Sequence, residues 1–256
     1  MSGAFRWPQL IERVRRTYER LCRVDVTRRD GSIRLRLTSF ALEADHYAMS
    51  EVSLVTPTAG LYESWLDSRD EWGGAGVHQP GSGLGVARQL GLDLESRSEF
   101  ERWVRELLQP MATPRPDAVP VTNWWIVRDG RYLGSIQLRH RLNDFLADVG
   151  GQIGYGIRPS ERRKRIATRA LRQVLGFAGD RIELSSVLIT CDEENVGSRK
   201  TIEACGGVLD SVRRSDEISR GVGHAGDSLR FWVPTAGSYH GGETSSICQR
   251  QPPART

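Results

Sequence analysis

Cysteine is scarce in this sequence, and long apolar runs are missing. Its 256 residues include only four cysteines, and no two of them have CxxC spacing. This number fits no disulfide framework and the spacing fits no structural zinc site, so we expect a reducing compartment and no metal. No apolar run approaches the roughly 18 residues that cross a bilayer, and the first residues lack a signal peptide's apolar core. The sequence predicts a soluble, cytoplasmic protein.

A strong charge imbalance and internal repeats are also missing. Lys and Arg number 36 against 32 Asp and Glu, a net charge of +4, so basic residues matter only where they cluster. Hydrophobic residues make up 38% of the chain, which is a globular rather than a disordered composition. We expect an extension over 1–50, a main domain over 51–235, and a frayed tail over 236–256.

Hydrophobic periodicity and turn residues predict a mixed α/β chain. In the extension we expect an amphipathic helix over 5–24 and a strand over 33–37. The expected strands of the main domain cover 52–55, 121–127, 132–138, 152–157, 186–191, 208–212 and 229–233. One expected helix of this domain follows Gly60, and the others cover 97–109, 166–178 and 195–205. A long loop over 73–91 holds seven glycines, and a Pro-rich connector covers 110–120.

A basic run lies where the strand over 152–157 leads into a helix. Seven cations surround one anion, Glu161: Arg158, Arg162, Arg163, Lys164, Arg165, Arg169 and Arg172. A helix N-terminus exposes unpaired N–H groups and a partial positive charge, so this turn suits a ligand with several phosphates. Taken alone, the run is also explained by a solvated charged face or a nuclear-targeting peptide.

Two segments together resemble the GNAT superfamily of N-acetyltransferases. The superfamily's acetyl-CoA motif, (Gln/Arg)-x-x-Gly-x-(Gly/Ala), is matched in part by Arg162-x-x-Arg165-x-Ala167 within GYGIRPSERRKRIATRALRQVL. The second segment, VLITCDEENVGSRKTIEACGG, is similar to the strand and helix that line the pantetheine arm. The resemblance is good over 120–235 and plausible from 52. It implies a mixed, mostly antiparallel sheet flanked by helices and acetyl-CoA as co-substrate.

The resemblance also implies which residues bind the cofactor. They are Tyr155, Gly156, Ile157, Arg162, Arg163, Lys164, Arg165, Ile166, Ala167, Thr168, Asn195 and Ser198. Two positions depart from the family. Arg165 replaces the motif's central glycine, so a Cβ stands where the backbone should approach the phosphates. Ile202 stands where many members have a Tyr that acts as general acid for the leaving thiolate.

Acetyl transfer to an amine needs a base that accepts the amine's proton. Asp192 and Glu193 follow the apolar strand over 186–191 and are the candidate catalytic residues. A charge bias before the next helix explains them equally well. His140 ends another strand and is more simply an ordinary histidine. Two motif matches, GVGHAG at 221–226 and GDSL at 226–229, lack their strand-to-helix context and are set aside.

An acidic helix beside the glycine-rich loop suggests the acceptor. Its candidate substrate-binding residues are Glu63, Asp67, Asp70, Glu71 and Trp72, although a solvated helix face is an alternative for the acids. We expect a small cationic amine, with an aminoglycoside-type antibiotic as the specific guess and resistance by modification as the role. Alternatives are a protein N-terminus or lysine as acceptor, and a non-catalytic CoA-binding module. We expect neither nucleic acid nor membrane as a partner, and a homodimer stays open.

Overall fold

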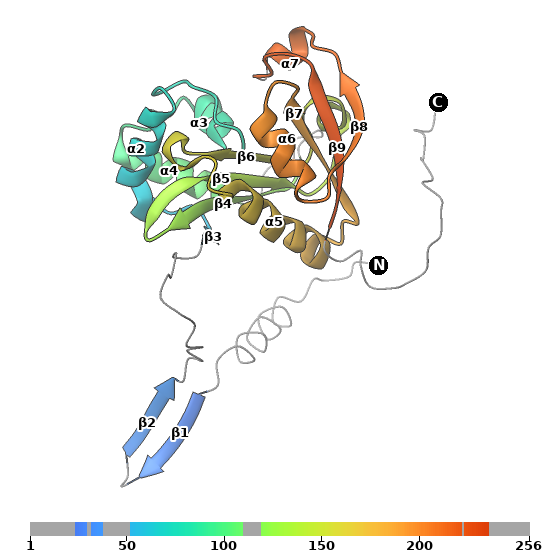
Figure 1. The fold of residues 1–256 in the computed structure, drawn as a ribbon. Helices are drawn as coiled ribbons and strands as arrows, with labels where there is room; N and C mark the ends of the chain where they lie inside the picture. The colour runs from blue at the N-terminus through green and yellow to red at the C-terminus, as the bar shows by residue number, and fades with distance from the viewer. Residues whose placement is uncertain (1–23, 30–31, 38–51, 110–118, 222, 236–256) are drawn as a thin grey trace, which may run out of the picture. The chain divides into compact units, whose positions relative to one another are not determined.

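The computed structural model describes residues 24–29, 32–37, 52–109, 119–221 and 223–235 of the chain (Figure 1). They fall in two compact units, Met1–Met49 and Ser50–Thr256. In the first unit, β1 (Val24–Arg29) and β2 (Ser32–Leu37) form an antiparallel hairpin. The predicted strand over 33–37 lies in β2, whereas β1 was not predicted. Most of the predicted N-terminal helix, the Pro-rich connector and the tail lie outside the described residues.

The second unit contains a four-stranded antiparallel sheet in the order β3-β4-β5-β6. Its strands are β3 (Ser53–Val55), β4 (Val121–Arg128), β5 (Arg131–Arg139) and β6 (Ile153–Ile157). Asp129 and Gly130 join β4 to β5, and both have positive φ, 52° and 70°. A two-residue turn of this kind matches the twist of the flanking strands, as the Asp-Gly pair predicts.

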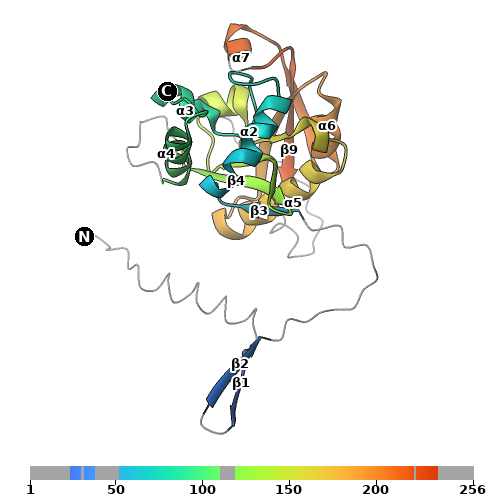
Figure 2. The ribbon, with the colours of Figure 1, turned by 90° about the vertical axis from the view of Figure 1, so that its left-hand side faces the viewer.

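Helices cover both faces of this sheet. On one face α2 (Tyr62–Glu71), α3 (Leu84–Leu90) and α4 (Arg97–Leu108) pack around an aromatic cluster that includes Trp65, Phe100, Trp103 and Trp125. On the other face lies α5 (Ile166–Ile182), which Figure 2 shows beside β3. Adjacent residues of β4 point to opposite faces, so Trp124 packs on Phe177 of α5 at 5.0 Å between ring centroids. Truncating a buried Trp of this cluster is expected to cost about 3–5 kcal/mol.

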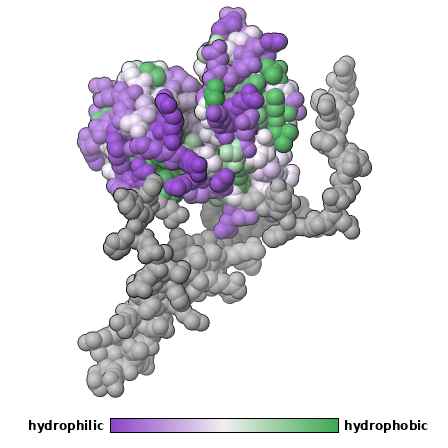
Figure 3. Space-filling view, viewed as in Figure 1, coloured by the Kyte–Doolittle hydropathy of each residue, from purple (hydrophilic) through white to green (hydrophobic). Residues whose placement is uncertain are grey.

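A second antiparallel sheet has the order β7-β9-β8. Its strands are β7 (Ser186–Asp192), β8 (Val208–Arg213) and β9 (Ser228–Pro234). The apolar residues of β7 and β9 share one core with α5. Two short helices, α6 (Val196–Glu203) and α7 (Glu217–Gly221), precede β8 and β9. Exposed apolar side chains gather over β8 and β9 (Figure 3), and they include Val208, Leu209, Val212 and Trp232.

The two sheets meet at one place and then separate. The backbone N–H of Gln152 donates to the carbonyl of Leu188 at 2.6 Å, and the Leu188 N–H donates to Gln152 Oε1 at 3.0 Å. From there β6 and β7 run apart, and along the described residues no ladder hydrogen bond joins them. The surface is notched between the two lobes in Figure 3. Any ligand between the sheets therefore meets backbone groups of β6 that have no strand partner.

Some predicted boundaries were wrong. The expected loop over 73–91 contains α3, which lies between Gly83 and Gly91, both left-handed with φ of 76° and 62°. Left-handed glycines cap helices, so the glycines that suggested a loop mark the helix ends. The expected last helix over 195–205 is followed by α7. Short 3-10 turns span Ala59–Leu61 and Pro159–Glu161, and a π turn spans Leu146–Gly150.

Among the described residues, no helix is both long and apolar enough to cross a membrane.

Candidate active site

The turn between β6 and α5 has an unusual backbone. Arg163 and Arg165 both adopt left-handed conformations, with φ of 60° and 59°. Such a conformation costs a non-glycine residue roughly 1–2 kcal/mol. Within the described part of the chain, no hydrogen bond is formed by the backbone N–H groups of residues 163–168. The start of α5 is therefore an open row of donors, which is the arrangement that binds phosphate.

Four of the seven cations near this turn are used for internal contacts. Arg158 is buried, and its Nε donates to Glu71 at 2.6 Å. Arg162 donates to the carbonyl of Ile157 at 3.1 Å, and its guanidinium lies 4.5 Å from the ring centroid of Trp72. Lys164 pairs with Glu161, and Arg172 donates to the carbonyl of Ala204. These contacts fix the shape of the turn.

Three arginines remain available at the same place. Arg163, Arg165 and Arg169 are exposed, and their side chains have no partner among the described residues. They stand on the turn and the first helical turn of α5, next to the open N–H groups. A ligand with several phosphates would meet both kinds of donor here. Of the seven predicted cations, three are thus available to a ligand and four make internal contacts that hold the turn.

A buried carboxylate holds the base of the turn. The Glu161 side chain is 6% exposed and contacts Arg128 at 2.8 Å, Lys164 at 3.1 Å and Arg131 at 3.4 Å. Burial alone would raise the pKa of Glu161, but the hydrogen bond and charge of Lys164, with Arg128 and Arg131, lower it below its usual value. The turn is therefore tied to the β4–β5 hairpin by an ionised carboxylate.

The α6 side of the space between the sheets carries a polar cluster. The Tyr155 hydroxyl of β6 lies 2.9 Å from Ser198 Oγ. Asn195 caps α6, because its Oδ1 accepts from the Ser198 N–H at 3.0 Å. Burial raises the pKa of Tyr155 well above its usual value, so the phenol keeps its proton. Ile202 is fully buried in the core and offers no polar group to this site.

The glycine-rich loop covers the opposite side of β6. A Cβ placed on Gly156 would lie 3.0 Å from the carbonyl oxygen of Pro80 and 3.3 Å from the Trp72 ring. The ring of His78, in the same loop, lies against Gly223, where a Cβ would be 3.1 Å from it. The loop thus reaches the connection between β8 and β9. Together they close one side of the space between the sheets.

Asp192 and Glu193 have different surroundings at the end of β7. Asp192 Oδ1 lies 2.5 Å from His224 Nδ1, and its Oδ2 accepts from the Ala225 N–H at 3.2 Å. The Glu193 side chain is exposed, and its backbone N–H donates to the carbonyl of Asp227. Only Asp192 is directed to a second titratable group. Glu193 has the position of a surface residue.

Comparisons with known proteins agree with this geometry. The sequence profile of the family described as the acetyltransferase (GNAT) domain matches residues 86–208. This chain carries a GNAT acetyltransferase domain. The expected superfamily, fold class and enzyme class, an acyltransferase, are thereby confirmed. A comparison with curated protein sequences finds no significant match.

Solved structures share the fold of the GNAT domain at low identity. A ribosomal L7/L12 alpha-N-protein acetyltransferase, RimL, has a TM-score of 0.52 and 12% identity, over 74% of this chain and 96% of its own. RimJ of Mycobacterium smegmatis has a TM-score of 0.50 and 18% identity, over 74% and 84% of the two chains. A probable acetyltransferase has a TM-score of 0.50 and 19% identity, over 72% and 92%. At such identities the likeness shows the fold alone.

The acidic helix α2 is less available than the sequence suggested. Glu71 accepts from buried Arg158 and from the Ser160 N–H at 3.0 Å. Asp70 pairs with Arg69 at 2.8 Å, and Glu63 lies 3.9 Å from Arg97. Asp67 alone among the four acids has no partner in the described part of the chain. Trp72 packs on Arg162 and Gly156, so it supports the turn between β6 and α5 and not an acceptor-binding surface.

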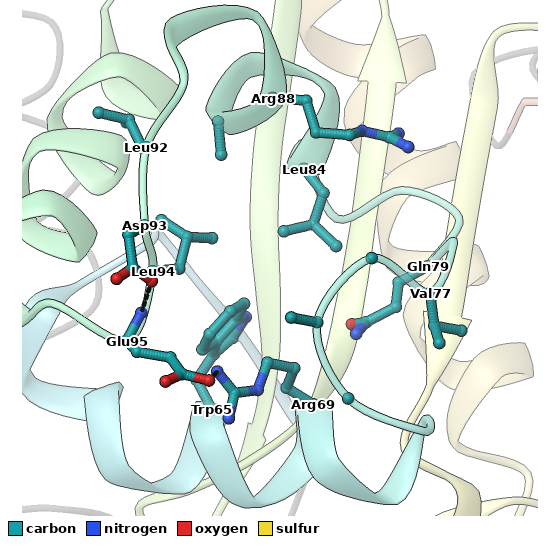
Figure 4. Close-up of a pocket in the computed structure, with 14 residues that line it drawn as sticks. Trp65, Arg69, Val77, Gln79, Leu84, Arg88, Leu92, Asp93, Leu94 and Glu95 are labelled. Carbon is teal, nitrogen blue, oxygen red and sulfur yellow. Dashed lines mark hydrogen bonds and ion pairs between the residues drawn. The ribbon is translucent and has the colours of Figure 1, made fainter.

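A cavity of about 150 Å³ lies behind the glycine-rich loop (Figure 4). Its walls come from α2, α3, the loop and the segment before α4, and most of the side chains are apolar, including Trp65, Leu84, Leu92 and Leu94. Gln79 also lines it, and its buried Nε2 has no hydrogen-bond partner. The loop therefore has β6 on one side and free volume on the other.

Sequence reasoning missed His78 and His224. His224 belongs to the GVGHAG match that was set aside, and Ser228 belongs to the GDSL match. The structure places Asp192, His224 and Ser228 together, but Ser228 Oγ lies 3.1 Å from Nδ1, the same ring nitrogen that contacts Asp192. A hydrolase triad needs the serine on the other nitrogen. The GDSL match therefore does not form part of a hydrolase triad, although polar and titratable side chains lie next to it.

Proposed function

We propose that this protein is an acetyl-CoA-dependent N-acetyltransferase that acts on a primary amine. One observation carries the proposal. The unpaired backbone N–H groups of residues 163–168 lie at the N-terminal end of α5, directly beside the place where β6 and β7 separate. The first feature suits a pyrophosphate, and the second suits an extended arm with amide groups that pair with a strand edge.

The residues present fit acetyl-CoA by charge as well as by shape. Arg163 and Arg169 supply positive charge for its pyrophosphate and 3′-phosphate groups. Asn195 and Ser198 begin α6 beside β6, where the arm would lie. When bound, the cofactor supplies an acetyl group activated as a thioester. Tyr155 places a protonated hydroxyl between β6 and α6, against Ser198, so we assign it as the hydrogen-bond donor to the leaving sulfur in place of the Tyr absent at 202.

We propose a small amine as acceptor. The contact between His78 and Gly223 closes one side of the space between the sheets, which favours a small molecule or a chain end over a lysine on a broad protein surface. Support for an aminoglycoside or another polycation is weaker than the sequence suggested, because only Asp67 among the acids of α2 is unpaired. The guess of antibiotic modification therefore rests on the general family likeness and on this one carboxylate.

A second candidate is a protein N-terminus. Such an end is narrow enough to enter beside the glycine-rich loop. RimL, which shares the fold, is itself described as an alpha-N-protein acetyltransferase. A peptide with a free N-terminus therefore belongs among the acceptors to be tested.

The test measures thiol release from acetyl-CoA with kanamycin, spermidine and an N-terminally free peptide as acceptors, with calorimetry of CoA binding in parallel. Turnover on kanamycin or spermidine, with none on the peptide, supports the small-amine assignment. Turnover on the peptide alone selects the second candidate. Tight CoA binding without turnover on any amine indicates a binding module, and absence of CoA binding overturns the proposal.

A further inference from the structure

His224 is held by groups from two strands of the second sheet. Its Nδ1 lies 2.5 Å from Asp192 Oδ1 on β7 and 3.1 Å from Ser228 Oγ on β9. The side chain is 17% exposed, and its backbone N–H donates to the carbonyl of Ser219 at the end of α7. Asp192 is held in turn by the Ala225 N–H. Both the ring and its carboxylate partner therefore have defined orientations.

This arrangement decides which ring nitrogen carries the proton. A carboxylate can only accept a hydrogen bond, so Nδ1 donates its proton to Asp192. In the neutral ring the lone pair is then on Nε2. Among the described residues, no hydrogen bond involves Nε2 of His224. The free nitrogen is the basic one.

Other charged and titratable groups come from the segments near His224. His78 comes from the glycine-rich loop, Arg88 from α3, and the paired Asp227 and Arg214 from the connection around α7. Partial burial, followed by the charges of Arg88 and His224, lowers the pKa of His78, so His78 is neutral at pH 7. A neutral His78 does not repel an ammonium group that approaches His224.

We propose that His224 is the general base for the acceptor amine and that Asp192 is its positioning residue. This assignment rests on the proposed acetyltransferase function. Asp192 was one of the two carboxylates, with Glu193, expected to act as base, and here it acts through the imidazole. His78 and Gly223 form the wall opposite, so the acceptor enters between the loop and the end of β7.

The proton balance of the step is simple. Nε2 of His224 takes one proton from the acceptor ammonium, and the amine nitrogen then forms a C–N bond with the acetyl carbon. The C–S bond breaks, and its electron pair stays on sulfur. The nitrogen loses a second proton as the amide forms. One of the two protons ends on sulfur as the thiol, and the other leaves through His224 to water.

The first experiment uses the full chain, acetyl-CoA, and whichever of kanamycin, spermidine or the peptide the wild type acetylates fastest. His224→Gln should lower kcat by about 10²–10⁴-fold, which is the usual contribution of a general base. CoA affinity should stay within about twofold. His140→Gln is the matched control, because His140 directly follows β5 and its side chain forms a hydrogen bond with that of Thr122. Equal kcat in His224→Gln and wild type, at saturating acceptor, would overturn the assignment.

The pH profile separates a base from a structural residue. A general base acts in its unprotonated form, so kcat/KM of the wild type should rise with pH to a plateau, and this rise should be lost in His224→Gln. In Asp192→Asn the plateau should fall by about tenfold or more, because the ring is no longer held. A rise that persists unchanged in His224→Gln would show that His224 is not the base, and a wild-type plateau in Asp192→Asn would show that Asp192 does not position it.

A measurement that needs no acceptor keeps this inference separate from the proposed function. ¹⁵N NMR of the histidine side chains should show the neutral His224 protonated at Nδ1 in the wild type, with a shift toward the Nε2-protonated form in Asp192→Asn. If the neutral His224 were protonated at Nε2, it could not be the general base, even if acetylation were observed. If the expected tautomer and shift appear but no amine is acetylated, the proposed function fails and the reactive pair remains.

Discussion

Gly81 lies so close to Gly154 that a Cβ on Gly81 would stand 2.1 Å from the Gly154 carbonyl oxygen. The contact joins the glycine-rich loop to β6, which carries the expected cofactor-binding residues Tyr155, Gly156 and Ile157. Gly81 also has a φ of 73°, which side chains rarely adopt. The loop can cross β6 at this distance only because both residues are glycine. The position of His78 depends on the same crossing, because His78 is three residues away.

Gly81→Ala should therefore displace the loop and impair acetyl transfer. We expect a loss of more than about 1 kcal/mol in unfolding free energy, because backbone strain adds to the steric clash. We also expect kcat/KM for the acceptor to fall at least tenfold. Gly91→Ala is the control, since Gly91 has a φ of 62° and open space around it. If both variants lose the same stability and keep full activity, the crossing does not position the site.

Arg165→Gly should stabilise the protein by about 1 kcal/mol, because glycine adopts the left-handed conformation at the start of α5 without strain. Arg165→Ala removes the same charge but keeps the strain, so the difference between the two variants isolates the backbone effect. Thermal or urea unfolding measures it.

The affinity of Arg165→Gly for acetyl-CoA should be kept or raised. The exposed guanidinium contributes little by itself, and glycine allows closer approach of the phosphates to the backbone. Calorimetry is the measurement. A drop of more than tenfold in both Arg165 variants would instead identify Arg165 as a phosphate ligand.

Glu161→Gln should destabilise the protein by about 2 kcal/mol at pH 7. Removing one partner of a buried ion pair costs more, about 3–5 kcal/mol, but Arg131 and Lys164 are half exposed and water screens them. Because the pKa of Glu161 is lowered in the folded protein, its contribution is present above the unfolded value of about 4.3 and is lost as pH falls through the folded value.

The pH dependence gives this prediction its control. Urea unfolding of the wild type and Glu161→Gln should differ fully at pH 7 and progressively less below about pH 4. A difference that stays constant into acid would mean that Glu161 acts by shape or by a neutral hydrogen bond. The exposed pair of Arg199 and Glu203 offers a comparison, since Glu203→Gln should change stability by less than about 1 kcal/mol.

Local signals allowed much of the fold to be predicted. The hairpin of β4 and β5 follows from Asp129-Gly130 between two apolar runs, and α5 follows from helical spacing behind a basic turn. The helix α3 was missed because it has only seven residues between glycines that resemble a loop. The separation of β6 from β7 could not be predicted, since it depends on how two sheets meet at Gln152 and Leu188.

The candidate site was predictable only where its residues are consecutive. The turn between β6 and α5 is a continuous segment, so its residues were found together. Which of its cations are free and which are paired depends on tertiary partners such as Glu71 and Trp72, and the sequence does not show these contacts. His224 is 32 positions from Asp192, and His78 is farther still. A single histidine in a glycine-rich stretch carries no local signal, so packing alone reveals the cluster.

Tyr155→Phe should lower kcat by about 10–100-fold while CoA affinity changes little, because the phenol is assigned to the leaving sulfur and not to the phosphates. Burial raises the pKa of Tyr155, which keeps the hydroxyl protonated and able to donate across the neutral pH range. Ser198→Ala is the matched control. It removes the partner 2.9 Å from the hydroxyl but leaves the phenol in place. If Tyr155→Phe and Ser198→Ala lose the same activity, the hydroxyl serves only to hold α6 against β6. A much larger loss in Tyr155→Phe, with stability lowered by only about 1 kcal/mol in each variant, supports donation to the sulfur.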